Sequence, residues 1–123
     1  MTKQWQAYAF HIVDAIAKIR RIQARGSIAE DEVLYDATLR NLQTMSEATQ
    51  GLPQDLKVGF PDIPWRDISG FRNILTHNYL GDIDPLTIVA VFDRHLPALE
   101  AAVLDMLASD GAPAAGAGAR RDE

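Results

Sequence analysis

Apolar residues recur along most of this chain at spacings of three and four, and this period limits the fold more than any other feature. In the first segment the apolar stripe contains Trp5, Tyr8, Ile12, Ile16 and Ile19. Residues at these spacings lie on one face of an α-helix. We find no convincing strand pattern and no internal repeat. The period therefore predicts an all-α, up-down helical bundle.

Helix start and stop signals divide the first half of the chain. Gly26 is expected to cap the end of the first helix. Ser27 and Glu30 resemble a capping box, which predicts a second helix over about residues 28–50. Gly51 and Pro53 should close that helix. Its apolar stripe is expected to include Val33, Ala37, Leu42, Met45 and Ala48.

The same signals divide the second half. After a loop or short turn over 51–61, Asp62 and Pro64 predict a third helix that continues to about Leu80. A fourth helix should follow Asp84 and Pro85. Because proline lacks an amide donor and clashes with the preceding turn, Pro97 is expected to interrupt it. A short fifth helix over 98–109 would complete a bundle of four main helices.

Length and composition place this bundle in one domain over 1–109. Residues 110–123 are rich in Gly, Ala and Pro and lack large apolar groups, so we expect a disordered tail. The chain has no cysteine, which excludes disulfides and cysteine-ligated zinc. It shows neither an apolar run of about 18 residues nor a signal-peptide pattern. We therefore expect a cytoplasmic protein that does not enter a membrane.

The charge pattern is mixed. A net charge of −5 argues mildly against a broad nucleic-acid-binding surface. Bases dominate residues 1–25 and acids dominate residues 26–36. A local basic strip is one reading of this pattern, and two solvated helix faces are the other.

The third predicted helix has a polar front that a merely solvated face does not usually show. Successive helical residues turn by about 100°, so the polar and apolar residues separate onto opposite sides. The apolar side holds Ile68, Phe71, Ile74 and Leu75, while small Ser69 and Gly70 leave room toward the polar side. The polar side holds Arg72, Asn73, Thr76, His77 and Tyr79.

This set contains the minimum of groups that cleavage of RNA without a metal needs. The His77 imidazole can exchange a proton near neutral pH. Arg72 can hold phosphate oxygens through two parallel donors and stabilise the charge that grows on them. Asn73 could orient the imidazole or bind phosphate, and Arg72 and Thr76 are candidate RNA contacts. One motif supplies only one histidine, whereas a symmetric homodimer would supply two proton-transfer groups.

Other readings stay open. Arg72 and His77 alone also fit structural roles, because short motifs are loose. The chain could be an interaction module without activity, anchored by Trp5, Phe60 or Trp65, or a nucleotide-binding domain in which Arg72 holds a phosphate. His11 and His95 have no comparable neighbours and are expected to be structural or surface residues. No His/Asp/Glu spacing indicates a metal site, and no cofactor is expected.

Residues 63–84, "IPWRDISGFRNILTHNYLGDID", resemble the signature segment of the HepT-like toxins of the HEPN superfamily. The pattern is Arg, four residues, His, one residue, Tyr, and it reads here as Arg72, His77 and Tyr79. The second helix is also similar, with Glu47 where that family usually has a Glu-Ala pair. The resemblance covers about residues 5–108.

The resemblance implies a homodimeric endoribonuclease toxin with two motifs facing a common cleft and with tRNA or mRNA as substrate. Arg72 and His77 would be the catalytic pair, followed by Asn73. The implied partner is an MntA-like nucleotidyltransferase antitoxin that transfers AMP to Tyr79. Phosphate added there would lie against Arg72, and the adenosine would fill the cleft.

Overall fold

The computed structural model describes residues 4–70 and 85–111, and all regular structure within these residues is helical. The helices are α1 (Gln4–Arg25), α2 (Glu32–Thr49), the single turn α3 (Gln54–Lys57) and the long α5 (Pro85–Gly111); residues 65–70 are also helical. The prediction of an all-α fold is confirmed. None of the described helices is both long and apolar enough to cross a bilayer.

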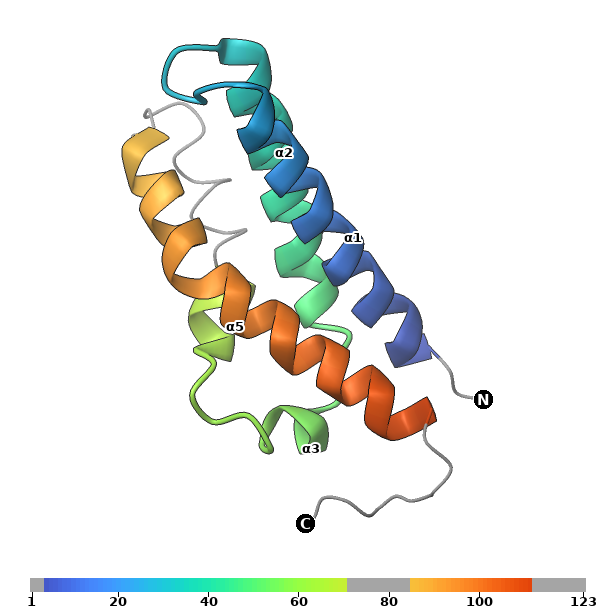
Figure 1. Cartoon of the computed structure of the whole chain (residues 1–123). Coiled ribbons are helices and arrows are strands. Elements are labelled where there is room, and N and C mark those ends of the chain that lie inside the picture. Colours follow the sequence, from blue (N-terminus) through green and yellow to red (C-terminus); the bar gives the residue numbers. More distant parts are fainter. Residues whose placement is uncertain (1–3, 71–84, 112–123) are drawn as a thin grey trace.

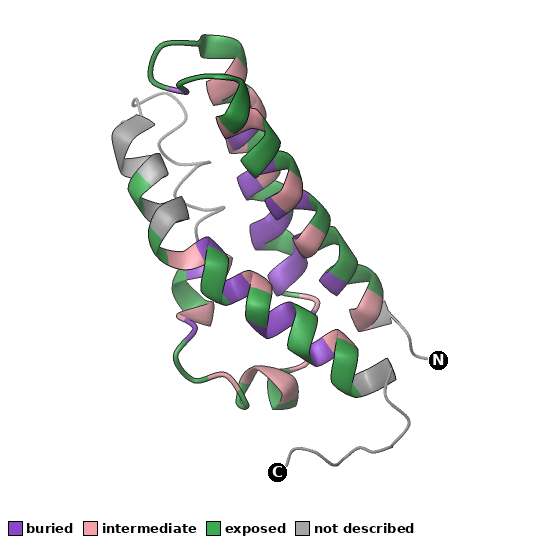
Figure 2. Ribbon diagram, in the orientation of Figure 1, coloured by how far each residue is buried: buried purple, intermediate pink, exposed green. Residues whose placement is uncertain are grey.

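α1 and α2 lie side by side in opposite directions, and α5 packs across α1 (Figure 1). The core lies where these three helices face one another (Figure 2). Its fully buried side chains include Ile12, Ile16, Ile19, Leu42, Leu99 and Val103. One ion pair joins α1 to α5, with Arg20 Nη1 2.6 Å from Glu100 Oε1. Burial of apolar helix faces is therefore the main stabilising contribution.

The predicted stripe of α1 is largely correct. Ile12, Ile16 and Ile19 have no exposed surface, and Trp5 packs against the core. Tyr8 differs, because it is 42% exposed at the edge of the stripe. The helix ends at Arg25, directly before Gly26, as expected.

The predicted start of α2 at Ile28 is wrong by four residues. Asp31 is the N-cap, and its Oδ1 accepts hydrogen bonds from the amides of Val33 (2.9 Å) and Leu34 (3.3 Å). A carboxylate at this position also interacts favourably with the helix dipole. Ser27 instead stabilises a turn, in which its Oγ accepts from the amide of Ala29. This turn lets Ile28 enter the core, where it is 4% exposed.

The buried face of α2 also differs from the prediction. Leu42, Met45 and Ala48 are buried as expected, but Val33 is 74% exposed in the first turn. Three hydroxyl residues complete the buried face instead, namely Thr38, Ser46 and Thr49. They continue the helical period, so the error lay in treating the period as apolar only. The helix ends at Thr49, before Gly51 and Pro53, as predicted.

The expected interruption at Pro97 is wrong, because α5 is one helix with Pro97 inside it. Pro97 is exposed, while Leu96 and Leu99 beside it are buried. On the solvent side, water can hydrate the carbonyl that loses its donor, and the helix bends instead of breaking. Figure 1 shows α5 changing direction near its middle. The helix passes the expected domain end at Ser109 and includes the first two residues of the expected tail over 110–123. The rest of that tail, 112–123, lies outside the described residues.

Candidate active site

All five residues of the predicted polar front lie outside the described residues. Arg72, Asn73, Thr76, His77 and Tyr79 belong to the segment 71–84, so their predicted roles stay predictions. The structure does describe the residues that lead into this segment, and the helix α5 that follows it. The described residues therefore include the supports at the entrance of the candidate site.

The helical stretch before the motif begins at Trp65. Pro64 was expected in the first turn but directly precedes it, and the Pro64 carbonyl accepts the amide of Ile68 at 3.0 Å. Asp62 was the expected cap, but it lies three residues ahead of the first helical residue. A proline fits this position because its missing N–H would have no partner in the first turn.

Trp65 ties this helix start to the last residue of α3 and to the loop that follows it. Its indole Nε1–H donates to two carbonyls, those of Lys57 at 3.2 Å and Phe60 at 3.1 Å. The Lys57 ammonium lies 5.8 Å from the centroid of the Trp65 ring. Burial lowers the pKa of Lys57, while the ring favours its charged form. Trp65 is thus an internal anchor, which weakens its reading as an anchor for a partner protein.

A second support joins the last turn of α2 to Ser69. The Thr49 Oγ1 lies 2.9 Å from the Ser69 Oγ, and the amide of the Gln50 side chain donates to the Ser69 carbonyl at 3.4 Å. Thr49 has no exposed surface. This contact was not predicted, since nothing in the sequence signals a pairing of hydroxyls 20 residues apart.

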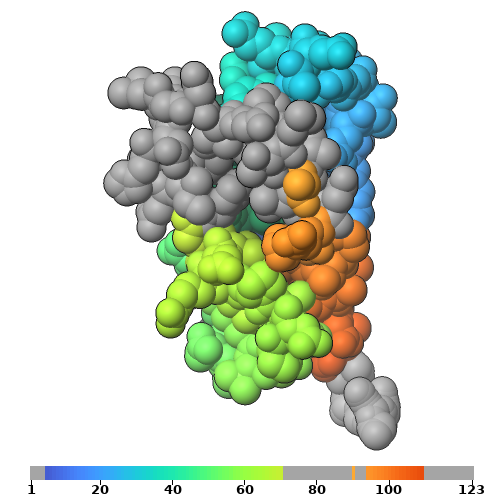
Figure 3. Space-filling model, turned by 90° about the vertical axis from the view of Figure 1, so that its left-hand side faces the viewer, coloured from blue at the N-terminus to red at the C-terminus, as the bar shows by residue number. Residues whose placement is uncertain are grey.

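Gly70 closes the described part of this stretch. A methyl group added at Gly70 would find no atom of the described residues within 4 Å. The expectation that Ser69 and Gly70 leave room for a ligand or another backbone stays a prediction. Figure 3 shows the atoms of residues 54–70 on one face of the molecule, beside those of α5.

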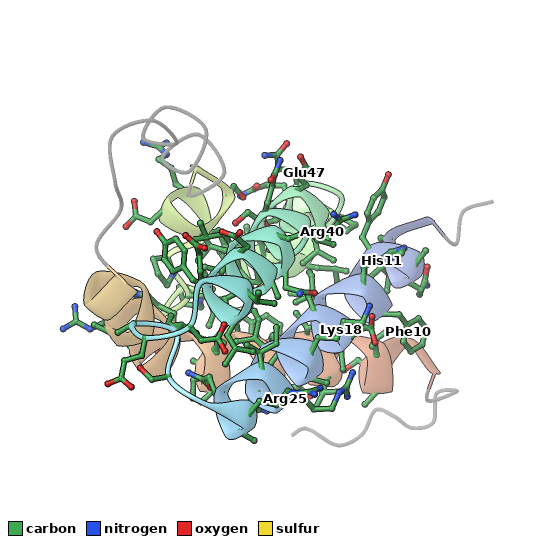
Figure 4. All side chains as sticks on the ribbon, turned by 90° about the horizontal axis from the view of Figure 1, so that it is seen from above. Phe10, His11, Lys18, Arg25, Arg40 and Glu47 are labelled. Atoms are coloured by element: carbon green, nitrogen blue, oxygen red, sulfur yellow. The ribbon has the colours of Figure 1, made fainter. Side chains whose placement is uncertain are left out.

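The remaining candidate residues lie on other elements. Glu47 is exposed on α2, and His11 is exposed on α1 (Figure 4). His95 is half-buried on α5, and Phe60 packs against the core like Trp5. Within the described part of the chain, no group of three His, Asp or Glu side chains could hold a metal ion.

A pocket of about 310 Å³ opens where the start of α1, α3 and the end of α5 meet. Its walls are mainly apolar, with one carboxylate and one hydroxyl. They comprise Trp5, Pro53, Asp55, Leu56, Met106 and Ser109. This set contains no histidine or arginine, so it lacks the groups that acid–base cleavage of a phosphodiester needs.

Comparison with known proteins places these supports in a family context. A family model described as "Ribonuclease HepT-like" matches residues 12–106, which is most of the chain. The match includes the supports at Thr49, Trp65 and Ser69 and the whole motif segment. No solved structure matches the chain.

Individual relatives agree with the family match. A protein of Methanocaldococcus jannaschii, provisionally named an RNase, is 33% identical over 70 residues, which cover 57% of this chain and 63% of the relative. A provisionally named RNase of Caldanaerobacter subterraneus is 32% identical over 78 residues, covering 63% of this chain and 69% of the relative. The "Probable ribonuclease HepT" of Thermococcus cleftensis is 29% identical over 105 residues, covering 81% of this chain and 93% of the relative. The chain thus spans slightly less than two thirds of the first relative and nearly all of the third.

Proposed function

This chain belongs to the HepT-like ribonuclease family, and from that membership we propose that it is a metal-independent endoribonuclease of the HEPN type. The observation that carries the proposal is the family match over 12–106, because it contains Arg72, His77 and Tyr79 at the spacing of the signature. The names of the relatives point to the same chemistry. We propose tRNA or mRNA as the substrate.

In the proposed reaction, a neutral His77 takes the proton of a ribose 2′-hydroxyl. The 2′-oxygen attacks the adjacent phosphorus, and the bond from phosphorus to the 5′-oxygen breaks. A protonated imidazole gives its proton to that leaving oxygen. The products are a 2′,3′-cyclic phosphate and a 5′-hydroxyl. Arg72 stabilises the negative charge on the phosphoryl oxygens, while Asn73 and Thr76 orient the imidazole and the RNA.

The two proton transfers motivate a homodimer. One imidazole takes a proton while a second gives one, and each copy of the motif carries a single histidine. Two motifs that face a common cleft would supply both groups. We therefore propose that the active form contains two chains.

We further propose that the protein is a cytoplasmic toxin controlled by an MntA-like nucleotidyltransferase. The Tyr79 oxygen would attack the α-phosphate of ATP, with pyrophosphate leaving and AMP remaining on the tyrosine. The added phosphate would pair with Arg72, and the adenosine would occupy the space of the substrate. Co-expression with the nucleotidyltransferase should add the mass of one AMP or more, and Tyr79→Phe should abolish that gain. An unchanged mass would contradict this control.

The cleavage proposal is tested with purified protein and total tRNA in excess EDTA. The wild type should cleave, whereas Arg72→Ala and His77→Ala should each lose at least about 100-fold in rate. Intact RNA with the wild type would contradict the proposal. It would favour the alternative, in which the bundle only binds a nucleotidyltransferase.

A further inference from the structure

Thr49 makes two hydrogen bonds at a fully buried position. Its Oγ1 lies 2.6 Å from the backbone carbonyl of Ser46 and 2.9 Å from the Ser69 Oγ. A hydroxyl has one hydrogen to donate, and a carbonyl can only accept. The Thr49 hydrogen therefore goes to Ser46, so the Ser69 hydroxyl must donate to Thr49. The Ser69 hydroxyl thus donates to Thr49, and the Thr49 hydroxyl donates to the Ser46 carbonyl.

This chain of bonds fixes one element relative to another. Thr49 is the last residue of α2, and Ser69 lies three residues before Arg72 in the sequence. The Gln50 side chain adds a bond to the Ser69 carbonyl. One helical turn earlier, Trp65 holds the same stretch to the loop at Lys57 and Phe60. The approach to the motif is thus fixed at two points about 6 Å apart along the helix.

Core packing alone does not explain the hydroxyl of Thr49. A valine has nearly the same shape and would enter a fully buried site without desolvating a polar group. Thr38, on the same helix and also without exposed surface, provides the comparison. Its Oγ1 makes no hydrogen bond within the described part of the chain. The two threonines share burial, but among the described residues only Thr49 bonds to the Ser46 carbonyl and to Ser69.

We propose that Thr49 and Ser69 are positioning residues, because their bond holds the helical stretch 65–70 against α2 at the point where the chain enters the catalytic segment. This proposal rests on the proposed function, since the segment in question carries Arg72 and His77. The pair acts through these residues and does not itself touch the substrate. Small displacements of reacting groups change rates strongly, so a single lost bond at this point should be visible in catalysis.

The test compares Thr49→Val with Thr38→Val as the matched control and Thr49→Ser as the rescue. We expect Thr49→Val to lower kcat for RNA cleavage roughly 10-fold, with KM unchanged. Thr38→Val and Thr49→Ser should keep the kcat of the wild type. Ser69→Ala should match Thr49→Val, and the double variant should be no worse than either single variant. If the wild type is active and Thr49→Val and Thr38→Val both have the same kcat as the wild type, the proposal is overturned.

A second readout does not depend on catalysis. Amide hydrogen exchange over residues 65–70 should be faster in Thr49→Val than in the wild type, and Thr38→Val should leave it unchanged. If the wild type cleaves no RNA, the proposed function fails. The exchange rate of residues 65–70 still shows whether the bond between Thr49 and Ser69 holds this stretch in place. Unchanged exchange in Thr49→Val would overturn the positioning role by itself.

Discussion

Gly51 and Gly70 have opposite surroundings, although both lie close to the supports of the candidate site. A methyl group added at Gly51 would overlap the ring of Tyr8 at its base, so the whole ring would have to shift. A methyl group at Gly70 would meet no atom of the described residues within 4 Å. The close approach of α1 to the end of α2 therefore depends on the missing side chain at Gly51, whereas packing makes no such demand at Gly70.

This contrast predicts stability changes of opposite sign. Gly51→Ala should lower the free energy of unfolding by about 1 kcal/mol or more, as overpacking does. Gly70→Ala should raise it by up to about 1 kcal/mol, because alanine favours the helix over glycine. Urea denaturation of both variants measures this directly. Tyr8→Ala should remove the penalty of Gly51→Ala, and a persisting penalty would show that the ring is not its cause.

At the scale of elements, Trp65 joins the helix start to the loop after α3. Trp65→Phe keeps an aromatic ring but removes the donor shared by the carbonyls of Lys57 and Phe60. We expect a loss of about 1 to 2 kcal/mol in the free energy of unfolding, since two carbonyls lose their partner. The same denaturation assay checks this value. Lys57→Met is the control, because it keeps the backbone carbonyl, and a loss confined to Lys57→Met would contradict the role of the indole.

The elements also show how far the sequence can predict this structure. Periodicity and stop signals predicted the all-α class, the end of α1 before Gly26 and the end of α2 before Gly51. Ser27 and Asp31 can both cap a helix, and they lie four residues apart. Asp31 is the N-cap of α2, because the turn at Ser27 places Ile28 in the core. Pro97 was expected to break a helix because the sequence cannot say that its ring faces solvent.

The site could be predicted less completely than the fold. The small size of Gly70 predicted free space there, and none of the described atoms fills it. The bond between Thr49 and Ser69 depends on the register of two packed elements, which local patterns do not contain. The roles of Arg72 and His77 stay predictions, because their segment lies outside the described residues.

At the scale of the whole molecule, the proposal requires two chains. A single motif holds one histidine, so a monomer would lack the second proton-transfer group. Analytical ultracentrifugation should give twice the mass of one chain at the concentrations used for cleavage. Arg72→Ala and His77→Ala should each be inactive alone. A mixture of the two variants should differ in activity from either variant only if the subunits exchange and share sites. Full activity in a monomer would contradict the shared cleft.

The chemistry of the cleaved ends tests the central claim most directly. RNA cut by the wild type in EDTA should end in 2′,3′-cyclic phosphates and begin with 5′-hydroxyls, as mass spectrometry of the fragments would show. His77→Ala, purified identically, should yield none of these ends, which also excludes a contaminating ribonuclease. Fragments that begin with 5′-phosphates, or cleavage that EDTA abolishes, would contradict attack by the 2′-hydroxyl without a metal.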